Sequence, residues 1–487
     1  MGSRRLTFPI LLLSITLLTA CGGKSNSSSS SNPPGSTPQS LGMFSGTYAF
    51  LVADRGCVCT FAAAGSLKAD GAGNISSGVM DINYAGSVQN NVAVSGTYTV
   101  DIHGRGSANL KSSGGTYAFR FVILSATHAF VIGFDTYENA SGTMDLQDSS
   151  AFSASSLAGS FAFLVSGTDA AGEALQIGGV ITSNSSGNIS SGIEDVHDNQ
   201  IIETALSIAP APMSVAASSG RGVFSLSSSF GTSDYAFYVV GANHLKLIEM
   251  DAGTILYGDA YLQESSSTSQ IAGSYAFTTF GWTSGVPLPL SAGGVFLADS
   301  SGNIASGTED QNNNGSIAQN SQLSGKYTLA SNGRGTLTLT TSSGTTTFAI
   351  YPSVAGIQLL EIDSSGTTDG MAFLQQASSF SSASLNGNFG LSTTGSSAGE
   401  ISDQLAALSA DGNGNVAGTM DLNNERSPEA GLSVKGTYSI SSNGRGTTTL
   451  TTSAGISNLN MYMVDSSLTL TLSLDNTSMM VGSLEKN

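Results

Sequence analysis

Apolar residues alternate with polar or small residues in many short segments of the chain. In the segment that begins at position 45, Tyr48, Phe50 and Val52 occupy every second position. This period of two places one row of side chains on a single face of an extended strand. In the first part of the chain the pattern predicts eight strands, at 46–54, 62–69, 75–83, 92–102, 106–112, 115–124, 128–135 and 141–147. The fold class is therefore predicted to be all-β.

The predicted strands are joined by short loops with a common form. LKADGAGNIS from position 67 and TLASNGRGTLT from 328 both pass from a strand through Asp or Asn and two small or polar residues to glycine and the next strand. This form is typical of a hairpin with a type I turn followed by a left-handed glycine. Short hairpins make consecutive strands neighbours, so we expect an antiparallel meander. Eight such strands close most simply into a small barrel, although a β-sandwich would show the same alternation.

This pattern of strands and turns recurs four times. The openings SGTYAFLV, AGSFAFLV, AGSYAFTT and NGNFGLST start at 45, 158, 272 and 386, which gives intervals of 113, 114 and 114 residues. Such a period is too long for a solenoid repeat and suits an independent domain. We predict four tandem β domains at 41–148, 157–264, 271–376 and 385–487. Because their linkers are short, neighbouring domains should touch, through interfaces that are small and mobile.

The N-terminus has the features of an export signal. Arg4 and Arg5 precede the apolar run 6–18, which is too short to span a membrane, and Leu-Thr-Ala-Cys follows at 18–21. The segment resembles a bacterial lipoprotein signal peptide with its lipobox; an ordinary secretory signal is the alternative. The resemblance implies that residues 1–20 are removed, that Cys21 carries the lipid, and that Gly22, in place of Asp, permits an outer-membrane or surface location. Residues 21–40 are Ser-, Asn- and Pro-rich and are predicted to form a disordered tether.

The charge of the chain narrows the range of partners. It has 16 Lys and Arg against 34 Asp and Glu, a formal net charge of −18, and no segment in which basic residues cluster. Nucleic acid is therefore not expected as a partner. The expected partners are the membrane, through the N-terminal lipid, and a glycan or a cell-surface protein.

Two charged residues recur once in every domain. A turn needs the glycines of the GRG motif but not its arginine, so the four arginines call for another explanation. We expect each arginine to form a bidentate pair with the recurring aspartate of its own domain, for example Arg334 with Asp310. The competing interpretation is that each arginine holds an acidic glycan or a lipid head group. The candidates are Arg105, Arg221, Arg334, Arg445, Asp81, Asp195, Asp310 and Asp421.

Residue patterns that would indicate catalysis or metal binding are not found. GSSAG at 395–399 matches the nucleophile motif of hydrolases, but the fourth domain contains no histidine. The four histidines show no metal-ligand spacing, and only two of them share a repeat position. We therefore predict no catalytic residue, no metal site, no cofactor and no enzymatic activity. The histidines are His103, His128, His197 and His244.

The domain length, the opening Gly-x-aromatic motif and the hairpin spacing resemble those of avidin- and lipocalin-type eight-stranded barrels. The four-copy arrangement is similar to secreted bacterial repeat proteins. A biotin site is not implied, because such pockets use several tryptophans and this chain has only Trp282. Two functions remain open: a surface spacer, adhesin or structural protein, or a carrier that binds a small molecule or glycan in each barrel. Cys57 and Cys59 occur only in the first domain and have no assigned role.

Overall fold

The computed structural model describes residues 41–55, 59–263 and 271–487. The predicted signal peptide, Cys21, the tether and Cys57 lie outside these residues. Within the described chain the four copies of the repeat belong to one compact unit. All of the strand pairs are antiparallel, and a few short 3-10 turns are the only helical segments that the described residues contain.

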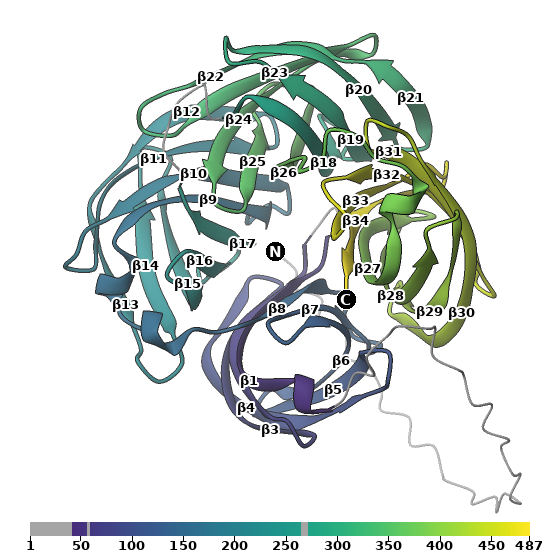
Figure 1. The fold of residues 1–487 in the computed structure, drawn as a ribbon. Coiled ribbons are helices and arrows are strands. Elements are labelled where there is room, and N and C mark those ends of the chain that lie inside the picture. Colours follow the sequence, from purple (N-terminus) through teal and green to yellow (C-terminus); the bar gives the residue numbers. More distant parts are fainter. Residues whose placement is uncertain (1–40, 56–58, 264–270) are drawn as a thin grey trace, which may run out of the picture. The chain divides into compact units, whose positions relative to one another are not determined.

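The first copy is a closed barrel in which each strand pairs with the next and β8 returns to pair with β1 (Figure 1). The fourth copy closes in the same way, through β27 and β34. The all-β prediction and the barrel prediction are thus confirmed, and the β-sandwich is excluded. The strands of copy 1 are β1 (Ser45–Ala53), β2 (Phe61–Asp70), β3 (Asn74–Tyr84), β4 (Ser87–Val100), β5 (Arg105–Ser112), β6 (Gly115–Ser125), β7 (His128–Gly133) and β8 (Ser141–Leu146). Those of copy 4 are β27 (Asn386–Ser397), β28 (Glu400–Asp411), β29 (Asn415–Asn424), β30 (Ser427–Ile440), β31 (Arg445–Thr452), β32 (Gly455–Met463), β33 (Leu468–Ser473) and β34 (Ser478–Lys486).

Copies 2 and 3 differ from the other two in their fourth strand, which is divided in two. In copy 2 both parts pair with β11, and the pairing of β10 with β11 completes the barrel. The strands of copy 2 are β9 (Gly159–Thr168), β10 (Ala174–Ser183), β11 (Asn188–Asp198), β12 (Ile201–Ile208), β13 (Ala211–Val215), β14 (Arg221–Ser227), β15 (Thr232–Gly241), β16 (His244–Glu249) and β17 (Ile255–Leu262). Those of copy 3 are β18 (Gly273–Thr283), β19 (Pro289–Ala298), β20 (Asn303–Asn313), β21 (Ser316–Gln322), β22 (Ser324–Leu329), β23 (Gly335–Thr341), β24 (Gly344–Ser353), β25 (Gly356–Glu361) and β26 (Gly366–Leu374).

The strand ends predicted for copy 1 agree with the structure to within two residues, except at the start of β4. This strand begins at Ser87 rather than at 92. Its early part is mostly exposed and polar, so no alternation marks it. A bulge interrupts its pairing with β3, and Asn91 takes a positive φ of 53° there.

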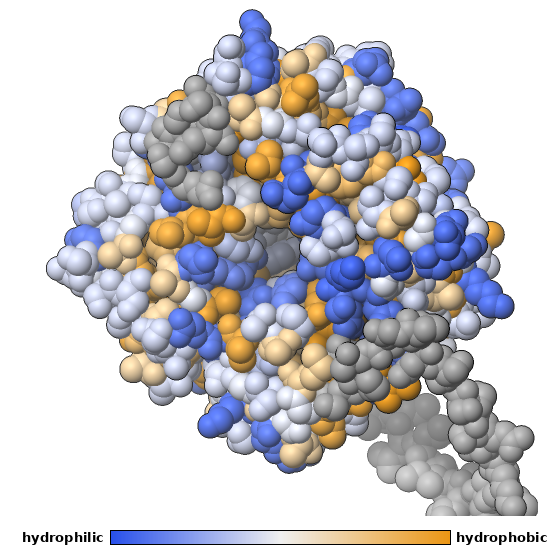
Figure 2. Space-filling view, viewed as in Figure 1, coloured by the Kyte–Doolittle hydropathy of each residue, from blue (hydrophilic) through white to orange (hydrophobic). Residues whose placement is uncertain are grey.

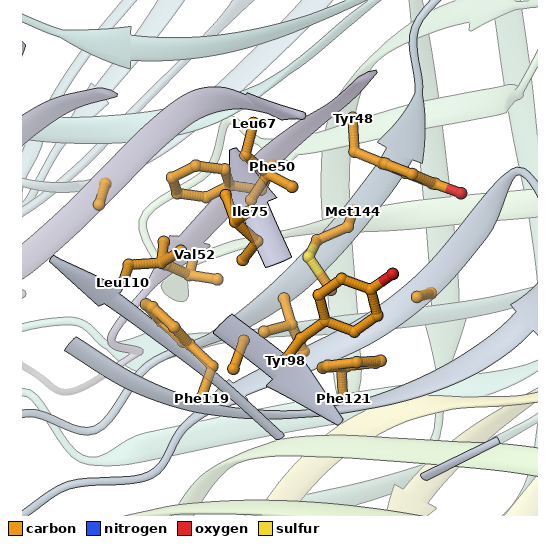
Figure 3. Packing of buried hydrophobic residues seen from close by; sticks show 14 of the residues in the cluster. Tyr48, Phe50, Val52, Leu67, Ile75, Tyr98, Leu110, Phe119, Phe121 and Met144 are labelled. Atoms are coloured by element: carbon orange, nitrogen blue, oxygen red, sulfur yellow. The ribbon is translucent and has the colours of Figure 1, made fainter. Parts of the chain in front are cut away.

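Aromatic and aliphatic side chains pack together in the interior of each barrel. In copy 1, Tyr48 and Phe50 of β1 and Phe119 and Phe121 of β6 point into the barrel (Figure 3). Phe44 lies across one end and stacks on Tyr48, with ring centroids 4.5 Å apart. Each of the other copies has its own buried cluster of this kind. Burial of a large apolar side chain stabilises a fold by about 1.5–3 kcal/mol, so each barrel has its own source of stability.

Candidate functional site: the junctions between the copies

The GRG motif forms the predicted turn. In copy 3, Gly333 has a φ of 80°, its amide donates to the carbonyl of Ala330, and the amide of Ala330 donates to the carbonyl of Arg334. The first glycine of the motif has a positive φ in the other copies as well. The turn places the arginine at the start of the following strand in copies 1, 2 and 4 and directly before it in copy 3.

The arginines pair with the aspartates, but between copies. The guanidinium of Arg334 donates from Nε and Nη2 to the two carboxylate oxygens of Asp195, at 2.7 and 2.6 Å. The predicted pair of Arg334 with Asp310 in the same copy is therefore wrong. Asp195 cannot face its own barrel core, because the next residue, Val196, belongs to that core and side chains alternate along a strand. The same bidentate contact joins Arg221 to Asp81 and Arg445 to Asp310.

The carboxylate at each of these junctions is buried and surrounded by donors. Asp195 is fully buried and accepts hydrogen bonds from Arg334, from the hydroxyl of Tyr351, and from the amide of Ala205 at the bulge of its own copy. The hydrogen bonds to Asp195 raise the pKa of Arg334, although burial acts against them. Because a buried charge is tolerated only when it is paired and hydrogen-bonded, this set of contacts fixes which surfaces of two copies meet.

A second polar position, two residues after each aspartate, was missed by the sequence analysis. Its side chain is fully buried and contacts backbone carbonyls of the following copy. Asn312, for example, donates from Nδ2 to the carbonyls of Ser473, Asp475 and Ser478. The sequence could have revealed this position, because in every copy a polar residue follows the aspartate by two places. That spacing puts both side chains on the same face of the strand. The four residues are Asn83, His197, Asn312 and Asn423.

The fourth copy contacts the first in the same manner, so the junctions form a closed cycle. Arg105 donates from Nη2 to Asp421 at 2.6 Å, and Asn423 donates to the carbonyls of Gly133 and Glu138. The aspartate of this closing junction accepts fewer hydrogen bonds from the neighbouring copy than the aspartates of the other junctions. Nε of Arg105 is buried and has no hydrogen-bond partner in the described part of the chain, and Val122 stands where the other copies have the tyrosine that binds the aspartate.

Side-chain sizes match across every junction. Tyr351 lies against Gly178, where an added Cβ would be 2.7 Å from the tyrosine ring. Tyr462 meets Gly293 in the same way. At the closing junction the sizes are reversed, and Leu405 packs with Val122. All four junctions contain a buried apolar cluster, so they are more than the small contacts expected from the linkers.

The recurring end of the repeat also reaches the next copy. Gln147, which ends MDLQ, donates from Nε2 to the carbonyls of Ser219 and Val239 beside the GRG turn of copy 2. Gln375 makes the equivalent contacts with copy 4. At the closing junction the last residue, Asn487, donates to the carbonyl of Ile123.

Two histidines that share a repeat position belong to one buried charge network. Lys246 is 1% exposed and lies 2.8 Å from Asp145 and 3.7 Å from Asp259. His128 contacts Asp145 at 2.6 Å, and His244 contacts Asp259 at 2.7 Å. Burial lowers the pKa of His128, but the hydrogen bonds with Asp145 and Glu485 outweigh this effect and raise it to about 9. Lys246 and His128 therefore compensate the charge of the buried Asp145.

The other two histidines have structural surroundings. His197 lies in a junction and contacts the carbonyls of Glu361 and Asn199 through its two ring nitrogens, whereas His103 lies in the GRG turn of copy 1. No group of three or more potential ligands that could hold a metal occurs among the described residues. Cys59 is buried and has no disulfide partner among the described residues, and its Sγ donates to the carbonyl of Phe61.

The barrel of copy 3 has a cavity of about 180 Å³ that contains two acidic side chains, Glu309 and Glu361. Burial is the main cause that raises the pKa of each to about 7. Oε1 of Glu361 accepts a hydrogen bond from Ser365, and Oε2 accepts one from Thr368. By contrast, the cavity in the barrel of copy 4 measures only about 20 Å³.

These two acids give a pH dependence with a definite sign. A carboxyl whose pKa is higher in the folded than in the unfolded state binds more protons when folded, so stability falls as the pH rises from about 4.5 to 7. We expect Glu361→Gln to reduce this fall, measured as melting temperature at pH values from 4.5 to 8. An equal slope in the variant and the wild type would contradict the assignment. Glu400→Gln, at an exposed position, is the control.

In comparisons with known proteins, no family model, curated protein or solved structure matches the chain. The structure has the eight-stranded barrels that the resemblance to avidin- and lipocalin-type proteins implies, but these comparisons support no relationship to those proteins, and no activity is carried over. In the part of the chain that the structure describes, no helix has the length and apolar character needed to cross a membrane.

Proposed function

We propose that this chain is an exported, lipid-anchored protein of the bacterial cell envelope that acts as a structural component or adhesin and has no enzymatic activity. The observation that carries the proposal is the cycle of buried Arg–Asp pairs between the copies. Contacts of this kind suit four barrels that act as one rigid body better than a flexible string of spacers. The apolar clusters inside the barrels of copies 1, 2 and 4 support this function over that of a carrier with a ligand in each barrel, whereas the barrel of copy 3 has a cavity of about 180 Å³.

The membrane attachment rests on the N-terminal sequence. Residues 1–20 would act as the signal peptide, and Cys21 would carry the lipid, in the manner of the bacterial lipoproteins that this segment resembles. An acyl chain contributes about 0.8 kcal/mol of membrane affinity for each buried methylene, and stable anchoring needs more than one chain. Gly22 after the cysteine favours the outer membrane or the cell surface.

Replacement of Cys21 by serine tests the anchor directly. In a bacterial host with lipoprotein processing, we expect Cys21→Ser to abolish incorporation of labelled palmitate and to move the protein from the membrane to the soluble fraction. Cys59→Ser is the matched control, because it removes the buried thiol of copy 1 and should leave labelling unchanged. The proposed anchor would be overturned if the Cys21→Ser variant still incorporated palmitate, or if it stayed in the membrane fraction without incorporating palmitate.

A further inference from the structure

A cavity of about 310 Å³ lies where the four copies meet. Strands β8, β17, β26 and β34, one from each copy, contribute to its wall, and the visible face of the molecule is hollowed between them (Figures 1 and 2). Each strand places a glycine there at the same repeat position. An added Cβ would lie about 2 Å from a carbonyl oxygen of the adjoining strand, so a side chain is excluded and the space stays open. These residues are Gly142, Gly258, Gly370 and Gly482.

A buried amide oxygen in the described part of this cavity's wall lacks a hydrogen-bond partner. Gln358 is 2% exposed, and its Nε2 donates to the carbonyl of Asp259 at 3.2 Å. Its Oε1 has no hydrogen-bond partner among the described residues, although it is buried. Buried amide oxygens are nearly always hydrogen-bonded. The cavity therefore offers an acceptor to a molecule that carries hydroxyl or N–H groups.

The ionic groups in the described part of the wall are already neutralised. Arg55 of copy 1 lies 3.4 Å from Asp369 of copy 3, which also accepts a hydrogen bond from Gln176 of copy 2. Asp259 is paired with His244 and Lys246. A charged ligand would lose its hydration in the cavity, and the described wall has no unpaired ionic group to compensate for that loss. The wall therefore favours a neutral molecule.

The remaining lining combines hydroxyl groups with apolar and aromatic surface. Ser166, Ser392 and Ser483 supply hydroxyls, and Phe130 and Tyr257 supply ring surfaces. The cavity volume equals that of about ten water molecules in the liquid, which leaves room for one sugar ring. We propose that the four copies together form a single binding site for a small neutral polyol of monosaccharide size.

The test measures binding of sugars to the full chain by saturation-transfer NMR and calorimetry. The probes are D-glucose, D-galactose, D-mannose and N-acetyl-D-glucosamine, with D-glucuronate and D-glucosamine as charged counterparts. We expect at least one neutral sugar to bind with one site per chain, and Gln358→Met to weaken it about tenfold. Gln404→Met is the matched control, because its Oε1 is also buried and unpartnered but does not line this cavity; its affinity should equal that of the wild type.

A second variant guards against misfolding as the explanation. Met371→Trp should fill the cavity and abolish binding, while circular dichroism and the melting curve report whether the barrels are intact. The proposal is overturned by no binding of any neutral sugar, by tighter binding of a charged sugar, by four sites per chain, or by unchanged affinity in Gln358→Met. It does not depend on the lipid anchor, so failure of palmitate labelling would leave it standing.

Discussion

Replacement of Asp195 by alanine is expected to lower the free energy of unfolding by about 3–5 kcal/mol, the usual loss when one member of a buried ion pair is removed. The variant leaves the guanidinium of Arg334 and the hydroxyl of Tyr351 without the carboxylate that both bind. The measurement is urea unfolding of the full chain, because Arg334 and Tyr351 belong to the next copy.

The closing junction provides the matched control for this experiment. Asp421 accepts only one hydrogen bond from Arg105, and Val122 offers no hydroxyl. Asp421→Ala should therefore destabilise the chain less than Asp195→Ala, by at least about 1.5 kcal/mol, the value of one hydrogen bond to a charged group. Equal losses in the two variants would show that the extra contacts at Asp195 contribute no stability.

Gly293→Leu is expected to separate copies 3 and 4 at their junction and to cost about 3 kcal/mol or more. An added Cβ at Gly293 would already lie 2.6 Å from the ring of Tyr462, and displacement of that ring also breaks its hydrogen bond to Asp310. The loss of stability combines overpacking at Gly293 with a buried tyrosine hydroxyl that is left without its hydrogen-bond acceptor. Thermal and urea unfolding of the full chain measure it.

A second substitution should reverse much of this loss. Gly293→Leu combined with Tyr462→Val reproduces the pair Leu405 and Val122 that the closing junction uses. We expect the double variant to be more stable than Gly293→Leu alone, with a coupling energy of about 0.5–3 kcal/mol in a double-mutant cycle. Additive losses would mean that matched side-chain size does not govern the contact between copies.

The reversed sizes at the closing junction also make copy 4 specific for copy 1. Leu405 leaves no space for a tyrosine ring, whereas Gly178 and Gly293 provide it. Copy 4 therefore fits copy 1, which carries Val122, and rejects copies that carry the tyrosine. Discrimination through a steric clash against the wrong partner is a common source of specificity.

The amino-acid sequence by itself determined the local structure of this protein. The period-two alternation around residues such as Tyr48 and Phe50 defined the strands, because side chains on a pleated strand point to opposite faces. The GRG glycines defined the turns, because only glycine enters the left-handed region without steric cost. The period of about 114 residues defined four copies. The alternation pattern did not predict the start of β4, because the residues there are exposed and polar and do not alternate with apolar ones.

The tertiary structure alone decided which copies meet and what lies between them. Alternation shows that Asp195 faces away from its own core, but not that its partner, Arg334, is 139 residues away in the next copy. In the sequence, Asn312 cannot be told from any polar residue on a strand surface. Only the structure shows that its side chain donates to backbone carbonyls of copy 4. The central cavity has walls from four separate strands, so no single segment contains its pattern. Periodicity fixes the direction of a side chain, whereas only the packing of whole barrels fixes its neighbour.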